Sequence, residues 1–292
     1  MPTTEPLYRL SVVRRILNDL GIRPAKRLGQ NFLVDKNTVE RILACTAAGP
    51  GDAILEIGPG LGVLTQGLLA RGAAVVAIEK DGRLVGALKE LFGAAPGFTL
   101  LHADALTVDL AAVLSDGAPR LPQGSPPVYK AVSNLPYYVT SPLLMHLLES
   151  PVPFERIVVM VQKEVAERLT ATPGSSAYGA LTVAVQYRAD VVPAFTVPPT
   201  VFYPPPSVLS QVLILRPRPS PHPVGQEELF FQVVRSAFGK RRKTLANALR
   251  DVEPDPERVR RALARAGIDP QRRGETLSLA EFANVSRALA AE

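Results

Sequence analysis

The chain has 292 residues, 47% of them hydrophobic and 21% charged, and a formal net charge of +6. This size and composition suit one large α/β domain followed by a smaller unit. The sequence has no apolar run approaching the roughly 20 residues that a membrane-spanning helix requires, and its first residues lack the layout of a secretory signal. One cysteine and three scattered histidines offer neither an intramolecular disulfide nor metal-ligand spacing. We therefore expect a cytoplasmic protein that binds no metal and no membrane.

Positive charges concentrate in two groups toward the ends of the chain. The first group is Arg9, Arg14, Arg15, Arg23, Lys26 and Arg27, and the second is Arg235, Lys240, Arg241, Arg242 and Lys243. Such groups suit a polyanionic partner, although a charge run alone is more often a solvated surface. The charges therefore indicate nucleic acid only if a site of matching chemistry accompanies them.

Taken in chain order, apolar residues first recur with a helical period and predict an amphipathic helix over residues 7–20. Short β-rich runs then alternate with helical segments, and strands are expected at 53–58, 73–79, 98–104, 128–134 and 156–162. This alternation predicts a Rossmann-like α/β fold with a parallel sheet covered by helices on both faces. Residues 116–127 are rich in Gly, Pro and Ser and indicate a surface insertion.

The chain changes character after residue 215. Residues 208–215 predict a further strand, and the segment 216–225 interrupts regular structure with repeated prolines. The residues beyond it carry helical periods, for example at 228–238 and 256–267, without strand patterns. We therefore predict a first domain over residues 1–218 and a small all-α domain over residues 219–292.

A glycine-rich turn follows the first of the predicted strands. In EIGPGLG, Gly58, Gly60 and Gly62 allow the backbone to approach a ligand closely at the start of a helix. A tight turn without a ligand has the same local pattern. The dinucleotide pattern G-x-G-x-x-G, counted from Gly58, would need glycine at Val63, which argues against an NAD-dependent oxidoreductase.

Acidic residues end the next two predicted strands. Glu79 follows the first glycine at the spacing of about 20 residues where a carboxylate can accept both hydroxyls of a ribose. Asp104 ends the third strand, where a carboxylate can accept the amine of an adenine. Either acid alone is unremarkable, but successive parallel strands bring their ends to one sheet edge, where open α/β folds bind ligands. The combination predicts a nucleoside site.

The fourth predicted strand ends in Asn134-Leu135-Pro136-Tyr137. The N6 amine of adenine is a poor nucleophile because its lone pair is delocalised into the ring, and the amide oxygen of Asn134 can accept its hydrogens during methyl transfer. Pro136 fixes the turn, and Tyr137 offers a flat face on which a base can stack. In isolation, NLPY is equally compatible with a simple turn and a core tyrosine. Beside a nucleoside site it predicts methyl transfer to a base.

Further motifs accompany these residues in order along most of the chain. The set is KRLGQNFL (26–33), LEIGPGLGVLT (55–65), Glu79, Asp104, NLPYY (134–138), MVQKEVAERL (160–169), FYPPPSVLS (202–210) and AFGKRRKTLANAL (237–249). Together they resemble the small-subunit ribosomal RNA adenine dimethyltransferases. Ser207 and Leu209 depart from the family pattern, which has a basic and then an acidic residue there, and this puts local RNA contacts in question.

The resemblance implies S-adenosylmethionine as the cofactor and gives roles to individual residues. The implied cofactor-binding residues are Gln30, Asn31, Leu33, Gly58, Gly60, Glu79, Asp104 and Asn134. The segment 30–33 is implied to close over the methionine and sulfonium end. The implied catalytic residues are Asn134, Pro136, Tyr137 and Phe202, with Phe202 as the second stacking face for a flipped adenine. The alternative for Phe202 is an ordinary core aromatic, which is the less favoured interpretation.

The substrate implied by the resemblance is a pair of adjacent adenines in the 3′-terminal hairpin loop of 16S ribosomal RNA, each methylated twice within the assembling small subunit. A basic run expected on a helix is implied to contact RNA phosphates: Lys240, Arg241, Arg242 and Lys243. We expect a monomer.

One alternative is the related large-subunit methyltransferase that confers macrolide resistance, against which KRRKTL argues. The other is a non-catalytic assembly factor, against which the intact Asn134 and Tyr137 argue.

Overall fold

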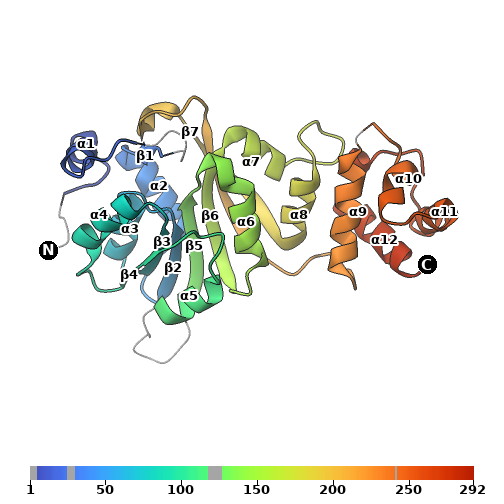
Figure 1. Ribbon diagram of the computed structural model, residues 1–292, viewed down its shortest axis with the longest axis horizontal. Helices are drawn as coiled ribbons and strands as arrows, with labels where there is room; N and C mark the ends of the chain where they lie inside the picture. Colours follow the sequence, from blue (N-terminus) through green and yellow to red (C-terminus); the bar gives the residue numbers. More distant parts are fainter. Residues whose placement is uncertain (1–4, 25–29, 118–126, 241) are drawn as a thin grey trace. The chain divides into compact units, whose positions relative to one another are not determined.

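The computed structural model describes residues 5–24, 30–117, 127–240 and 242–292. Contacts divide the chain into two units, drawn in Figure 1: the first comprises Met1–Ala166 and Val192–Pro217, and the second comprises Glu167–Val191 and Arg218–Glu292. The sequence pattern assigned residues 167–191 to the first domain, whereas their contacts place them in the second unit. Most of the predicted insertion at 116–127 lies outside the described residues.

The first unit is built on a seven-stranded sheet of order β4-β3-β2-β5-β6-β9-β7, of which the first three residues of β7 are counted with the second unit. The strands are β2 (Asp52–Ile57), β3 (Ala74–Glu79), β4 (Phe98–His102), β5 (Val128–Asn134), β6 (Phe154–Gln162), β7 (Ala189–Val197) and β9 (Ser210–Pro217). The pairs from β4 to β6 are parallel, whereas β9 runs antiparallel to β6. The Rossmann-like α/β fold is thus confirmed, with the correction that the sheet is mostly, not wholly, parallel.

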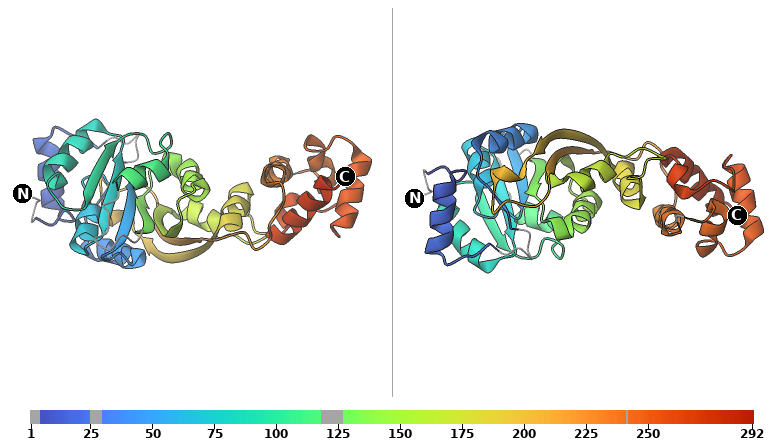
Figure 2. Two further views of the ribbon diagram at one scale, coloured as in Figure 1. Left: turned by 90° about the horizontal axis from the view of Figure 1, so that it is seen from below. Right: turned by 90° about the horizontal axis from the view of Figure 1, so that it is seen from above.

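Helices lie on both faces of this sheet (Figures 1 and 2). On one face, α2 (Lys36–Thr46) and α3 (Val63–Ala70) pack their apolar side chains against alternate residues of β2 and β3, such as Ile54 and Val75. On the other face, α5 (Leu110–Gly117) ends so close to Val76 that a Cβ on Gly117 would lie 3.2 Å from its side chain. Successive side chains of a strand point to opposite faces, so burial on both sides explains why β2 and β3 are buried at every residue.

The remaining helices of the first unit flank this core. They are α1 (Leu10–Asp19), α4 (Gly82–Phe92) and α6 (Thr140–Glu149), with short 3-10 turns at Tyr137–Val139 and Pro199–Val201. The predicted leading helix is present, although it begins at Leu10 and not at residue 7. Leu10 itself is 37% exposed, whereas the buried face of α1 carries Val12, Val13 and Leu17.

Two short strands form a separate antiparallel pair beside the main sheet. β1 (Phe32–Leu33) pairs with β8 (Phe202–Tyr203), so that Leu33 lies opposite Phe202. The pairing brings two segments that are far apart in the sequence into contact.

The second unit is helical and has its own hydrophobic core. Its residues belong to α7 (Lys163–Leu169, which begins in the first unit), α8 (Ala180–Arg188), α9 (Glu227–Gly239), α10 (Leu245–Ala248), α11 (Pro256–Arg265), α12 (Leu279–Ala290) and the 3-10 turns Leu249–Asp251 and Gly274–Thr276. Tyr178 and Tyr187 pack into one core with Phe230 and Phe282. This shared core explains why residues 167–191 belong with the C-terminal helices.

Candidate active site

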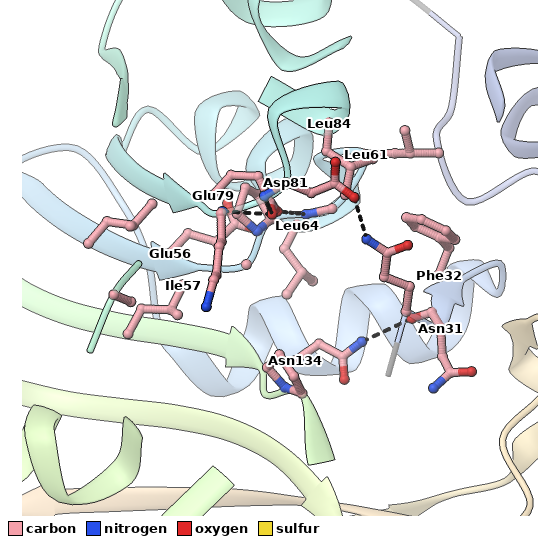
Figure 3. A pocket seen from close by; sticks show the side chains of 18 of the residues that line it. Asn31, Phe32, Glu56, Ile57, Leu61, Leu64, Glu79, Asp81, Leu84 and Asn134 are labelled. Carbon is pink, nitrogen blue, oxygen red and sulfur yellow. Dashed lines mark hydrogen bonds between the residues drawn. The ribbon is translucent and has the colours of Figure 1, made fainter. Parts of the chain in front are cut away.

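A cavity of about 340 Å³ lies at the carboxyl ends of β2, β3, β4 and β5, the edge where open α/β sheets bind ligands (Figure 3). Its walls include every residue that the sequence analysis assigned to the cofactor: Gln30, Asn31, Leu33, Gly58, Gly60, Glu79, Asp104 and Asn134. Pro136 lines the cavity as well, whereas Tyr137 and Phe202 are not among the described lining residues. The predicted residues, which are spread from position 30 to position 136, therefore lie around one cavity.

The glycine-rich turn between β2 and α3 adopts a backbone that side chains rarely tolerate. Gly58, Gly60 and Gly62 have φ of +65°, +64° and +82°. Gly62 is the N-cap of α3, and a Cβ there would lie 2.4 Å from the ring of Phe92. Both conformation and space therefore require glycine at Gly62. The turn directs its backbone toward the cavity at the start of α3.

Glu79 ends β3 with a carboxylate that the backbone holds in place. The side chain is 7% exposed, and it accepts hydrogen bonds from the backbone N–H groups of Lys80 (2.9 Å), Asp81 (2.8 Å) and Gly60 (3.3 Å). Burial raises its pKa above the ordinary value, and these three donors oppose the rise. The carboxyl group is thus an immobilised acceptor on the cavity wall.

Asp104 follows β4 and forms an ion pair with Lys80. The Nζ–Oδ2 distance is 2.6 Å, and the backbone N–H of Leu106 donates to the other oxygen at 3.1 Å. The hydrogen bond from Lys80 is the main cause that holds the pKa of Asp104 below its ordinary value. Asp104 is therefore an ionised acceptor at the cavity rim, and the exposed Lys80 beside it is a group that the sequence analysis did not identify.

Asn134, the last residue of β5, has its amide oriented by the segment that carries Asn31. The Nδ2 group donates to the backbone carbonyl of Asn31 at 3.2 Å, as Figure 3 shows. Because this bond occupies the amino end of the amide, the carbonyl oxygen is the end left to accept hydrogens from a ligand. The hydroxyl of Ser133 donates to the carbonyl of Ile57 at 2.6 Å and braces the strand end.

Tyr137 and Phe202, the two predicted stacking faces, are both held by tertiary contacts. The hydroxyl of Tyr137 forms a 2.6 Å hydrogen bond with the hydroxyl of Ser210, and burial raises its pKa. Phe202 is 3% exposed and packs in a core cluster with Leu33. The core position that the sequence pattern allowed for Phe202 is therefore the one observed.

Comparison with known proteins decides the family. The protein-family model described as "Ribosomal RNA adenine dimethylase" matches residues 22–291 of this chain. The chain belongs to this family. The resemblance inferred from the sequence motifs is therefore confirmed, and with it an rRNA adenine dimethyltransferase that uses S-adenosylmethionine.

Relatives of this dimethylase match over nearly their whole length. "Ribosomal RNA small subunit methyltransferase A" of Pelotomaculum thermopropionicum is 51% identical, with 94% of this chain and 95% of that protein covered. The protein of the same name from Moorella thermoacetica is 49% identical, with the same coverage. These relatives support the small-subunit prediction over the large-subunit alternative.

Two solved structures share the fold of the dimethylase. The 23S rRNA methyltransferase ErmE is 27% identical with a TM-score of 0.64, and the match covers 89% of this chain and 100% of that one. A dimethyladenosine transferase from Plasmodium falciparum is 24% identical with a TM-score of 0.72, and the match covers 87% of this chain and 95% of that one. At this level of identity the second likeness shows the fold alone.

The described residues of the dimethylase's basic run are not on a helix, contrary to the expectation from sequence. Lys240, Arg242 and Lys243 follow the end of α9 and precede α10, and the N–H of Lys243 donates to the carbonyl of Lys240 in a turn. Lys240 pairs with Asp251 at 2.7 Å, whereas Arg242 and Lys243 are exposed. Arg241 lies outside the described residues. The run belongs to the second unit and not to the cavity.

The cavity of the dimethylase also contains acids that the sequence analysis missed. Glu56, inside the glycine-rich motif, is 2% exposed and accepts a hydrogen bond from the hydroxyl of Thr65 at 2.6 Å. Asp81 caps α4 and accepts from the side chain of Gln30 at 3.0 Å. In the sequence, Glu56 is a carboxyl residue within an apolar strand, and Asp81 precedes a glycine at the start of a helix. Neither feature is specific to a ligand site. The Gln30–Asp81 bond connects the predicted closing segment to the start of α4.

Among the described residues, no group of three or more His, Cys, Asp or Glu side chains is arranged to hold a metal ion. Across the same ranges, no helix combines the length and apolarity needed to span a membrane.

Proposed function

We propose that this dimethylase transfers methyl groups to the N6 amines of two adjacent adenines in the 3′-terminal hairpin loop of 16S rRNA, twice each, within the assembling small subunit. The observation that carries the proposal is the amide oxygen of Asn134, which lies in the same cavity as Glu79 and Asp104 while its amino group is bonded to Asn31. The names of the relatives support the choice of the small subunit. We further propose that the enzyme acts as a cytoplasmic monomer.

The residues of the cavity fit S-adenosylmethionine. The cofactor has hydrogen-bond donors on its adenine, ribose and ammonium groups, and the cavity offers the buried acceptor Glu79 and the ionised acceptor Asp104. In the proposal Glu79 holds the ribose hydroxyls, Asp104 holds the adenine amine, and the turn from Gly58 to Gly60 approaches the methionine part. Gln30, Asn31 and Leu33 would contact its methionine end.

The chemistry assigned to Asn134 follows from the weakness of the nucleophile. The cofactor supplies an electrophilic methyl group on sulfur. The Asn134 oxygen accepts hydrogens of the adenine amine and so favours the pyramidal nitrogen of the transition state, in which the lone pair leaves conjugation with the ring. The methylated nitrogen is an acidic ammonium that loses its proton to water, so the site needs no strong general base. Pro136 keeps this turn rigid.

The flipped adenine is proposed to stack on Tyr137, whose ring the bond to Ser210 orients. The role of Phe202 as the second face rests on the resemblance. Because its ring is buried in the core, contact with a base requires a movement of the strand pair that contains it. In the second unit, Lys240, Arg241, Arg242 and Lys243 are proposed to bind RNA phosphates.

The proposal is tested by incubating the protein and methyl donor with small subunits that lack the modification, followed by mass spectrometry of the RNA. Two dimethylated adenines in the 3′-terminal hairpin are expected. Modification of large-subunit RNA instead would overturn the substrate assignment. Binding to subunits without any methylation, in a protein that binds the cofactor, would make the chain a non-catalytic assembly factor.

A further inference from the structure

The exposed face of helix α1 carries positive charge at a place that the proposed function does not use. Its opposite face is anchored, because Val13 and Leu17 pack into a core cluster with Leu61 and Leu84. The segment before the helix is also anchored, since the backbone N–H of Leu7 donates to the side chain of Gln66 at 3.1 Å. The outward side of α1 therefore has a defined orientation.

Arginines dominate this outward side. Arg9, Arg14 and Arg15 are exposed on α1 or at its N-cap, and the exposed Arg23 follows shortly after the helix. Glu5 forms an ion pair with Arg15 and so neutralises one of them. The other exposed polar side chains of the helix are Ser11, Asn18 and Asp19. Apart from Leu10, which is 37% exposed, the surface is cationic and polar, which suits an anionic backbone better than an apolar partner.

The arginine face adjoins the candidate active site. Val13, the neighbour of Arg14, lines the cavity, as does Leu7. The guanidinium carbon of Arg14 lies 4.9 Å from the centre of the Tyr203 ring, and Tyr203 pairs with Phe32 in the β1–β8 strands. The same two-residue strand contains Phe202. Arg14 is therefore beside the strand pair that the base-stacking proposal uses.

The contact with Tyr203 leaves Arg14 able to bind an anion. Stacking occupies the flat face of a guanidinium group, whereas its five N–H donors lie in the plane of the group and point outward from its edge. That edge matches the two oxygens of a phosphate in a bidentate contact. The planar guanidinium group is pre-organised, so it loses less entropy per hydrogen bond formed.

We propose that Arg9, Arg14 and Arg23 form a second RNA-binding surface, on the first unit, that holds phosphates of the strand delivering the target adenine to the cavity. The inference rests on the proposed function for the identity of the RNA. The contacts are to phosphate and not to bases, so they position the strand without reading its sequence. Lys26 and Arg27, which the sequence groups with these arginines, lie outside the described residues.

The test is a salt titration of binding to unmethylated small subunits with the variant Arg9→Gln/Arg14→Gln. Each lost phosphate contact should reduce the magnitude of the slope of log binding constant against log salt concentration by about 0.7–0.9. Loss of both contacts in the double variant should reduce it by about 1.4–1.8. The loss of affinity at 0.1 M salt should therefore exceed that at 1 M salt by about 25- to 60-fold. Cofactor affinity should not change.

A matched control removes two cations elsewhere on the first unit. Lys89→Gln/Arg71→Gln alters the exposed side of α4 and a cation paired with Glu40, and its slope should equal that of the wild type. If Arg9→Gln/Arg14→Gln lowers the melting temperature, the variant Arg9→Gln/Arg23→Gln is used in its place, because it leaves the contact between Arg14 and Tyr203 intact. Slopes parallel to the wild type in the folded variant would overturn the proposal. If the wild type methylates subunits but the slopes of wild type and variant are parallel, only the proposal of the arginine surface is refuted. If the wild type does not methylate subunits, the proposed function itself is refuted.

Discussion

The buried carboxyl of Glu56 should make the stability of the protein depend on pH. Its side chain is 2% exposed on the wall of the cavity. Burial raises its pKa from 4.5 to about 7, although the hydrogen bond from Thr65 opposes the rise. The folded protein therefore retains a proton on Glu56 that the unfolded chain releases at lower pH.

The sign and size of the effect follow from these two values. Since the folded pKa is the higher one, the stabilisation is fully present below about pH 4.5 and is lost as the pH rises through about 7. A tenfold change in proton affinity corresponds to about 1.4 kcal/mol, so complete loss of the stabilisation amounts to about 3 kcal/mol. Between pH 5 and pH 8 the expected change is about 2–3 kcal/mol.

The substitution Glu56→Gln keeps the size of the side chain and an acceptor for Thr65 but cannot titrate. We expect the free energy of unfolding of the wild type, measured in urea by circular dichroism, to fall by about 2–3 kcal/mol more than that of the variant between pH 5 and pH 8. Glu90→Gln, an exposed position on α4, controls for the loss of a carboxylate in general. An identical pH dependence in the wild type and Glu56→Gln would refute the reasoning.

Three further predictions concern the proposed site and the RNA contacts. Asn134→Ala should reduce methyl transfer by roughly 10²–10³, because one preorganised acceptor at the reacting centre is removed. Its effect on cofactor affinity should be smaller than its effect on turnover, although Asn134 also lines the cofactor cavity. Radiolabelled methyl transfer and calorimetry measure the two quantities, and turnover within a few-fold of the wild type would contradict the mechanism. Asp104→Ala should weaken cofactor binding, measured by calorimetry, by about 1–3 kcal/mol. Lys80→Met removes only the ion-pair partner of Asp104 and should weaken cofactor binding less. A larger effect of Lys80→Met than of Asp104→Ala would exclude Asp104 as a direct ligand. Arg242→Gln/Lys243→Gln should flatten the salt dependence of subunit binding by about 1.4–1.8 in slope, and lines parallel to the wild type would make this run a solvated turn.

Local patterns were sufficient for most of the sheet and for the strand-end residues of the cavity. The apolar runs that predict strands ending near Gly58, Glu79, Asp104 and Asn134 correspond to β2, β3, β4 and β5. Parallel strands share one carboxyl edge, so a residue at a strand end is placed in space by the sequence position alone once the alternation of strands and helices is known. This is why residues far apart in the chain were expected in one site.

The sequence pattern was insufficient to predict features that depend on contacts between residues far apart in the chain. No strand was predicted over Ala189–Val197, because β7 lies at the sheet edge, contains Pro193 and exposes Val192, and so lacks a buried strand's apolar run. A helix was expected for Lys240–Lys243, but the described residues Lys240, Arg242 and Lys243 lie outside the helices. The assignment of residues 167–191 to the second unit depends on which core Tyr178 and Tyr187 enter, and periodicity shows only that a face is apolar.

The sequence by itself therefore determined the class of fold and the strand-end residues of the cavity, because strand alternation, glycine spacing and acidic strand ends are local properties of the chain. The ordered motifs indicated the family and, through the resemblance, the further cavity residues Gln30, Asn31 and Leu33. Only the tertiary structure decided how those groups are tuned. The pairing of Asp104 with Lys80, the bond between Asn134 and Asn31 across 103 positions, and the raised pKa of Glu56 each depend on distance and burial in space. Electrostatic and hydrogen-bond energies vary with those two quantities, and neither can be obtained from the order of residues in the chain.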